Sequence, residues 1–118
     1  MDHAMKTTWD TYTASWKAAT VAEKQALFAA SLDANCTYTD PLGTASGWDA
    51  LTHTMHSFHQ QIPCGYFVTH HFASHHNYSM AQWKMHNGDG VEIGEGVSFG
   101  QYNDQGKLVS MTGFYDTP

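Results

Sequence analysis

Asp40 is the residue whose type and position most clearly permit chemistry in this sequence of 118 residues. It follows a short run with strong strand preference, residues 35–39, and directly precedes Pro41, which cannot continue a strand ladder. A carboxylate beside an apolar cavity loses hydration, and it can then shuttle a proton next to a carbonyl group. Asp40 can instead cap the loop that follows, as Asp before Pro and Gly often does, or it can recognise a ligand. The sequence leaves all three roles open.

Nine histidines form the second group of residues with chemical potential. His53, His56 and His59 are spaced three apart, so on a helix each is rotated by about 60° from the one before. His56 and His59 could share one metal ion, but adding His53 to them is geometrically poor. Neighbouring histidines on a strand, as at residues 70–71, point to opposite faces and make poor joint ligands. We therefore expect neither a metal site nor a cofactor.

A single histidine acting as a donor or a base is the remaining possibility, with His71, His75 and His76 as the candidates. The aromatic residues, four Trp, six Tyr and six Phe, suit a pocket for a flat or ring-shaped molecule, and they suit an ordinary core equally well. In residues 81–85 apolar and polar side chains alternate, and we expect the apolar face to line the cavity.

The elements that must position these residues begin with helices. One apolar face at helical spacing runs through residues 9–19. Thr20 and Glu23 then form a capping box at the start of a second helix. A third helix is expected over residues 48–60. Because the first two helices follow each other with almost no loop, we expect them to pack as a hairpin.

The second half of the sequence alternates in the manner of strands. After a first strand at 35–39, strands are expected over residues 66–72, 78–86, 91–102 and 108–115. Asn and Gly in residues 87–90 and 103–106 tolerate positive φ and predict hairpin turns, whereas residues 41–47 indicate a loop. Helices first and strands last favour an α+β fold with the helices on one face of the sheet. The length predicts a single domain over residues 1–118.

The charge content limits the partners. Five Lys and Arg stand against eleven Asp and Glu, for a net charge of −6. A nucleic-acid binder needs a basic face, so we expect no nucleic-acid partner, and for the same reason no anionic membrane surface. No apolar run is long enough to span a membrane. Only 14% of the residues are charged and 42% are hydrophobic, which indicates apolar surface shared with a partner, and a homodimer is the expected form.

The two cysteines, Cys36 and Cys64, match no metal or redox spacing. The first residues carry no signal-peptide pattern, so we expect both thiols to be reduced in a cytoplasmic protein. Each is expected to be a small buried packing residue.

Several segments, taken in order, resemble one known group of proteins. Residues 38–43 and the Gly47 that opens the next helix resemble the first strand and loop of SnoaL-like polyketide cyclases and ketosteroid isomerases, of the nuclear transport factor 2-like superfamily. Residues 82–85 and 95–99 are similar to the two long central strands, and residues 106–116 to the closing strand. The resemblance implies a cone-shaped, curved antiparallel sheet with three helices of the N-terminal half packed on it. It also implies a mostly apolar cavity and a homodimer formed through the sheet.

The resemblance further implies roles for individual residues. Asp40 falls where the isomerases carry their general base. Their donor tyrosine on the first helix falls at or next to Trp16, with Tyr12 the nearest tyrosine, and their second donor, an acid, is replaced by the weaker donor Ser98. The residues expected to line the ligand pocket are Tyr12, Trp16, Tyr38, Phe58, His71, Trp83, Met85, Ser98 and Tyr115.

One leading function and two alternatives follow. The leading one is a pocket protein for a small apolar or ring-shaped molecule, in which Asp40 is the base of an isomerase-like or polyketide-cyclase-like proton transfer. The absence of an acid at Ser98 also allows a binding module of the same fold without catalysis. Low charge and the glycine-rich residues 94–100 allow a third reading, a dimeric interaction module whose cavity is filled by its own aromatic residues.

Overall fold

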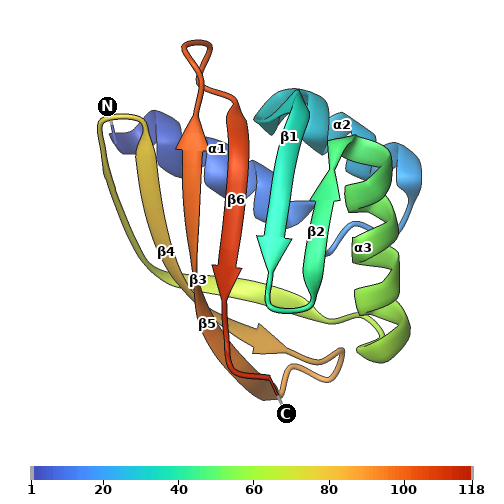
Figure 1. Ribbon diagram of the computed structural model, residues 1–118. Helices are drawn as coiled ribbons and strands as arrows, with labels where there is room; N and C mark the ends of the chain where they lie inside the picture. The colour runs from blue at the N-terminus through green and yellow to red at the C-terminus, as the bar shows by residue number, and fades with distance from the viewer. Residues whose placement is uncertain (1, 118) are drawn as a thin grey trace.

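Three helices and a six-stranded sheet form the structure, a computed structural model that describes residues 2–117 (Figure 1). In chain order the elements are α1 (Asp2–Ala14), α2 (Val21–Ser31), β1 (Leu32–Asp40), β2 (Gly43–Ser46), α3 (Gly47–Gln61), β3 (Tyr66–His75), β4 (Tyr78–His86), β5 (Glu92–Tyr102) and β6 (Leu108–Phe114). α1 packs against α2 and β3, and α3 packs against β1 and β2. The α+β class, with three helices of the first half packed on one sheet, is confirmed.

The sheet has the strand order β2-β1-β6-β5-β4-β3. Every neighbouring pair is antiparallel except β1 and β6, which run parallel, with Tyr38 beside Met111 and Thr39 beside Thr112. The sheet is therefore mixed, and the expectation of a purely antiparallel sheet is wrong at this pair. A tight turn forces antiparallel pairing, but most of the chain separates β1 from β6, so no turn sets their relative direction.

β2 occupies part of the segment that the sequence indicated as a loop. Gly43–Ser46 pairs with β1 across a two-residue turn, so that Asp40 lies opposite Gly43. The strand has four residues and a single buried one, Ala45. So short a segment carries too little alternation to be recognised from sequence.

α1 ends earlier than its apolar periodicity predicts. The periodic face extends to residue 19, but the helix ends at Ala14. There the chain tightens, and the Trp16 amide donates to the Thr13 carbonyl at 3.1 Å. Trp16 therefore sits in the turn that follows α1, although α1 and α2 still pack against each other as expected.

α2 begins at the predicted cap and supports that turn. The Glu23 amide donates to Thr20 Oγ1 at 3.1 Å, and the Thr20 hydroxyl donates to Glu23 Oε1 at 2.9 Å. One residue later, Lys24 is only 5% exposed, and its ammonium group donates to the carbonyl oxygens of Ser15 and Ala18. Because a buried ammonium group needs acceptors, this arrangement fixes the turn against α2.

The two predicted hairpin turns are confirmed. Gly90 has φ +81° and Gly106 has φ +77°. In the first turn Asn87 Oδ1 accepts from two following amides, and Asn103 Oδ1 does the same in the second. The turns therefore fix the register of β4 with β5 and of β5 with β6, which line one wall of the site described below.

A hydrophobic core lies between the helices and the sheet. Its fully buried large side chains include Trp9, Phe28, Leu51, Met55, Leu108 and Met111. Cys36 is buried in the same cluster, but Cys64 is exposed, in a turn where its own φ is +58°, so the expected packing role of Cys64 is wrong. Within residues 2–117 no helix is long and apolar enough to cross a membrane.

Candidate functional site

A cavity of about 740 Å³ opens between α3, the turn after α1 and the sheet. Six aromatic side chains line it: Trp16, Tyr38, Phe58, Phe67, Trp83 and Tyr115. Neighbouring rings contact one another around the wall. The ring centroids of Trp16 and Phe67 are 5.6 Å apart, and those of Phe67 and Trp83 are 5.0 Å apart. The cavity is therefore open space with a group of mutually contacting aromatic rings along part of its wall.

Strand alternation places these side chains on one face. Phe67 lies opposite Met85, and Trp83 lies opposite Gly96, so all of these positions face the cavity side of the sheet. A Cβ atom on Gly96 would lie 2.5 Å from Cζ2 of Trp83. The indole ring of Trp83 therefore occupies the space that any side chain at residue 96 would need.

Asp40 stands at the end of β1 on the cavity wall, and its two oxygens have different partners. Oδ1 accepts from the Leu42 amide at 2.8 Å and from the Gly43 amide at 3.2 Å. Oδ2 accepts from the Tyr38 hydroxyl at 2.7 Å. Oδ1 therefore caps the turn between β1 and β2, while Oδ2 is bonded to Tyr38, and both Asp40 and Tyr38 line the cavity.

Two tyrosines around Asp40 keep their protons at neutral pH. The pKa of Tyr38 is raised far above its usual value, first by burial, then by the neighbouring Tyr12 and by its hydrogen bond to Asp40. Burial, the charge of Asp40 and a hydrogen bond to it raise the pKa of Tyr115 to about 12. Both phenols are therefore available as hydrogen-bond donors at the wall.

Ser98 adds a third hydroxyl. The Trp83 indole Nε1 donates to Ser98 Oγ at 2.9 Å, which leaves the serine proton free to donate elsewhere. A Cβ atom on Gly113 would lie 3.5 Å from Ser98 Oγ, 3.8 Å from Asp40 Cβ and 4.0 Å from the Tyr38 hydroxyl oxygen. Three polar side chains thus converge around one glycine at the wall of an otherwise aromatic cavity.

Seven of the nine residues expected in the pocket line this cavity, together with Asp40. The seven are Trp16, Tyr38, Phe58, Trp83, Met85, Ser98 and Tyr115. Tyr12 is outside it. Tyr12 is 3% exposed, and its hydroxyl oxygen accepts a hydrogen bond from Trp16 Nε1 at 3.0 Å. Tyr12 therefore supports the position of Trp16 without lining the cavity.

His71 also lies outside the cavity. It is exposed and pairs with the exposed Gln82, and directly opposed residues share a face, so His71 points away from the cavity. A bulge between Thr69 and His71 inserts one residue and resets the alternation, which sequence alone does not reveal. His75 and His76 lie exposed at the turn between β3 and β4, with their Nδ1 atoms 3.1 Å apart.

Phe67 and Gly113 are two of the cavity-lining residues that were not expected from the sequence. Phe67 lies in a strand that was expected from the sequence. Its pairing opposite Met85 puts it on the cavity face of the sheet, which becomes clear only when the strand register is known. Gly113 carries no side chain, so its role as open space among Ser98, Asp40 and Tyr38 has no sequence signal.

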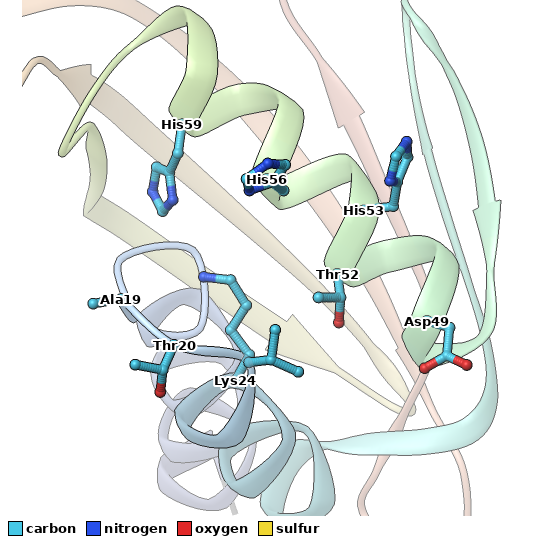
Figure 2. Close-up of a pocket in the computed structure, with 9 residues that line it drawn as sticks. Ala19, Thr20, Lys24, Asp49, Thr52, His53, His56 and His59 are labelled. Carbon is cyan, nitrogen blue, oxygen red and sulfur yellow. The ribbon is translucent and has the colours of Figure 1, made fainter.

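A second cavity of about 320 Å³ lies between α2 and α3. Figure 2 shows His56 and His59 on α3 above the groove, and Lys24 reaching from α2. The Lys24 ammonium is already engaged by two carbonyl oxygens, and burial lowers its pKa. Across residues 2–117 no group of three or more His, Cys, Asp or Glu side chains is placed to hold a metal ion. The groove therefore offers less definite chemistry than the aromatic cavity, although His53 borders both.

The comparisons with known proteins agree with this geometry. A solved structure from Agrobacterium tumefaciens, described as a candidate isomerase of the SnoaL-like family, is 23% identical, with a TM-score of 0.88 over 98% of this chain and 99% of that chain. A protein of unknown function with a cystatin-like fold from Methylobium petroleophilum gives 14% identity and a TM-score of 0.79 over 98% of this chain and 78% of that chain.

A nuclear transport factor 2-like protein of unknown function from Cytophaga hutchinsonii gives 13% identity and a TM-score of 0.70 over 95% of this chain and 89% of that chain. These likenesses show the fold alone. No functionally curated protein matches the chain significantly. The family model for the SnoaL-like domain matches residues 10–111. The chain therefore belongs to the SnoaL-like domain family and has its nuclear transport factor 2-like fold.

Proposed function

We propose that the chain binds a small apolar or ring-shaped molecule in the aromatic cavity and transfers a proton on it, with Asp40 as the base. The observation that carries this proposal is the position of Asp40, which lines the cavity with its Oδ2 atom 2.7 Å from the hydroxyl oxygen of Tyr38, another lining residue. The candidate isomerase activity of the Agrobacterium relative supports the same class of reaction.

The reaction needs a base that removes a proton from a carbon of the ligand and a donor that hydrogen-bonds the ligand's carbonyl oxygen. Asp40 would take a proton from the carbon next to a ligand carbonyl, and the electron pair of that C–H bond would move toward the carbonyl oxygen. Tyr38 would turn its hydroxyl from Asp40 to this oxygen as negative charge develops on it, with Ser98 as a second donor. Return of the proton to a different carbon then gives an isomer and restores the carboxylate.

The test is turnover of a β,γ-unsaturated cyclic ketone to its conjugated isomer, followed by ultraviolet absorbance. Wild-type protein should show saturable turnover, and Asp40→Asn should reduce it by about two to four orders of magnitude, the usual contribution of a general base. Circular dichroism should show that the variant is folded. Equal turnover by both proteins would remove Asp40 from the mechanism.

Binding without catalysis is a second candidate, which one observation favours. Asp40 already accepts hydrogen bonds from Tyr38, Leu42 and Gly43, so a large share of the roughly four acceptor positions of a carboxylate is taken. This candidate predicts saturable binding of ring compounds, and no incorporation of deuterium from heavy water into a bound ketone over long incubation. Nuclear magnetic resonance of the ketone separates the two functions.

We also propose that a second copy of the chain covers the outer face of the sheet. Phe99 and Phe114 are 45% and 55% exposed there, with ring centroids 5.7 Å apart. Lys84 and Glu95 lie opposite each other in the strand register, on this same face. A two-fold axis between them would place Lys84 of one copy near Glu95 of the other. The cavity of about 740 Å³ counts against the interaction module whose own aromatic residues fill the site.

A further inference from the structure

The charged side chains at the wall of the aromatic cavity are acidic. Asp40 and Asp116 line it, and among the described residues that border it there is no lysine. Glu95 also borders it, but Glu95 lies opposite Lys84 in the register of β4 with β5, so its side chain points to the outer face of the sheet. The sequence contains no arginine at all. Among the described residues His53 is the one basic side chain that borders this cavity, so a negatively charged ligand would meet no permanent counter-charge there.

Each of the five lysines is engaged elsewhere. Lys6 pairs with Asp10 at 2.7 Å, and Lys84 pairs with Glu92 at 3.3 Å. Lys24 and Lys107 donate to backbone carbonyl oxygens, and the Lys17 ammonium lies 4.8 Å from the centroid of the Tyr66 ring. A lysine that moved toward a ligand in the cavity would therefore lose a contact that it makes now.

The charge of Asp40, in contrast, has no cationic partner. Its hydrogen-bond donors are the phenols of Tyr38 and Tyr115 and two backbone amides, all neutral, and it forms no ion pair within the described part of the chain. Hydrogen bonds to neutral groups orient a carboxylate but do not cancel its charge. Asp40 therefore places an unbalanced negative charge at the cavity wall, in addition to the carboxylate of Asp116.

The aromatic wall favours the same ligand charge. Trp16 and Trp83 both line the cavity, and tryptophan has the face that attracts cations most strongly. Phe67 lies between them, and its ring meets the two indoles at 80° and 83°. These edge-to-face contacts hold the rings at the cavity wall in different orientations, and a cation that reached the face of either indole ring would be attracted to it.

We propose that the natural ligand of this cavity is an apolar cation, a ring-bearing amine or quaternary ammonium, whose charge rests against Asp40 and whose ring system contacts the aromatic wall. This inference rests on the proposed ligand-binding function and adds the charge of the ligand to it. A ketone substrate that also carries an amine would satisfy both.

The test uses three probes that share one cage and differ in charge: adamantylmethylamine, adamantylmethanol and adamantanecarboxylate. Isothermal titration calorimetry at pH 7 and low salt measures each dissociation constant. We expect the amine to bind at least about tenfold more tightly than the carboxylate, with the alcohol between them. In Asp40→Asn the amine should lose about tenfold in affinity, whereas the alcohol should change by less than about threefold.

A matched control removes the same charge far from the cavity. Asp104 is exposed in the turn between β5 and β6, so Asp104→Asn should leave all three affinities unchanged. Equal loss of amine affinity in both variants would assign the preference to net charge and overturn the role of Asp40. If wild-type protein binds all three probes equally, the charge inference alone fails. If it binds none of them, the proposed binding function fails as well.

Discussion

The Tyr38 hydroxyl donates to Asp40 Oδ2 at 2.7 Å from a position two residues earlier on the same strand. Residues two apart on a strand share a face, so β1 alone delivers the acid and its donor to the cavity. The backbone amides of Leu42 and Gly43 hold the other carboxylate oxygen. This pair supplies the base and the first donor of the proposed proton transfer.

Tyr38→Phe should therefore affect function more than stability. The change removes one hydrogen bond to a half-buried carboxylate, and we expect a loss of about 1 kcal/mol in unfolding free energy. Ketone turnover should fall by about two orders of magnitude or more, because the donor to the developing oxygen is lost. Urea titration and steady-state kinetics measure the two effects. Tyr78→Phe, at an exposed tyrosine of β4, should change neither.

Gly96 and Gly113 should respond differently to the same methyl group. A Cβ atom at residue 96 would lie 2.5 Å from Trp83 Cζ2 and 2.6 Å from the Phe114 carbonyl oxygen, so Gly96→Ala should destabilise the protein by about 1–3 kcal/mol. At Gly113 the nearest atom is 3.5 Å away, an ordinary contact, so alanine should fold normally. That methyl group would nevertheless stand among the polar groups and weaken ligand binding. Thermal melts with calorimetric titration would show whether the two effects separate in this way.

Lys24→Met should loosen the turn that carries Trp16. The ammonium group donates to the Ser15 and Ala18 carbonyl oxygens, and its loss should cost about 1–3 kcal/mol of unfolding free energy. The matched control is Lys6→Met, which breaks an exposed ion pair with Asp10 and a distant contact with the Phe72 ring, 6.0 Å from Nζ to the centroid, and should change stability by less than about 1 kcal/mol. Equal chemical-denaturation midpoints for the two variants would contradict a structural role for Lys24.

Stability should decline at alkaline pH because buried tyrosines hold their protons. Burial raises the pKa of Tyr102 to about 12 and shifts that of Tyr12 in the same direction, whereas an unfolded tyrosine ionises near about 10. Between these values the unfolded chain binds fewer protons, so the unfolding free energy falls as pH rises, by up to about 1.4 kcal/mol per pH unit for each such residue. The contribution is complete below about pH 10 and is lost as pH rises through 12.

Urea titrations from pH 9 to pH 12 measure this slope, and Tyr102→Phe should make it shallower. An unchanged slope in that variant would mean that Tyr102 ionises alike in the folded and unfolded chains.

A charged residue in the middle of the outer sheet face should separate the proposed dimer. Phe99→Asp places a carboxylate beside Phe114, and light scattering coupled to size exclusion should report a monomer. Val21→Asp adds the same charge at another exposed apolar residue, 55% exposed at the start of α2, and should leave the dimer intact. A wild-type protein that is monomeric at micromolar concentration would contradict the proposed sheet dimer.

The α+β class, the capped second helix and the turns at Gly90 and Gly106 could be predicted because each has a local cause: a period, a hydroxyl cap or a positive φ. The position of Asp40 followed from its place before Pro41. The parallel pairing of β1 with β6 could not be predicted, since it depends on contacts between distant segments. The face of His71 depends on a bulge that only the paired strand reveals.

The parallel pairing of β1 with β6 also means that the site cannot assemble until both strands have been synthesised. Tyr38 and Asp40 come from β1, whereas Ser98, Gly113 and Tyr115 come from the last two strands and the residue after them. During synthesis the acid is made early but has no cavity to face until about seventy further residues have left the ribosome, a count that follows from the distance between Asp40 and Tyr115. Such long-range closure is slow relative to local folding. Nascent chains should therefore acquire ligand affinity only after Tyr115 has been synthesised.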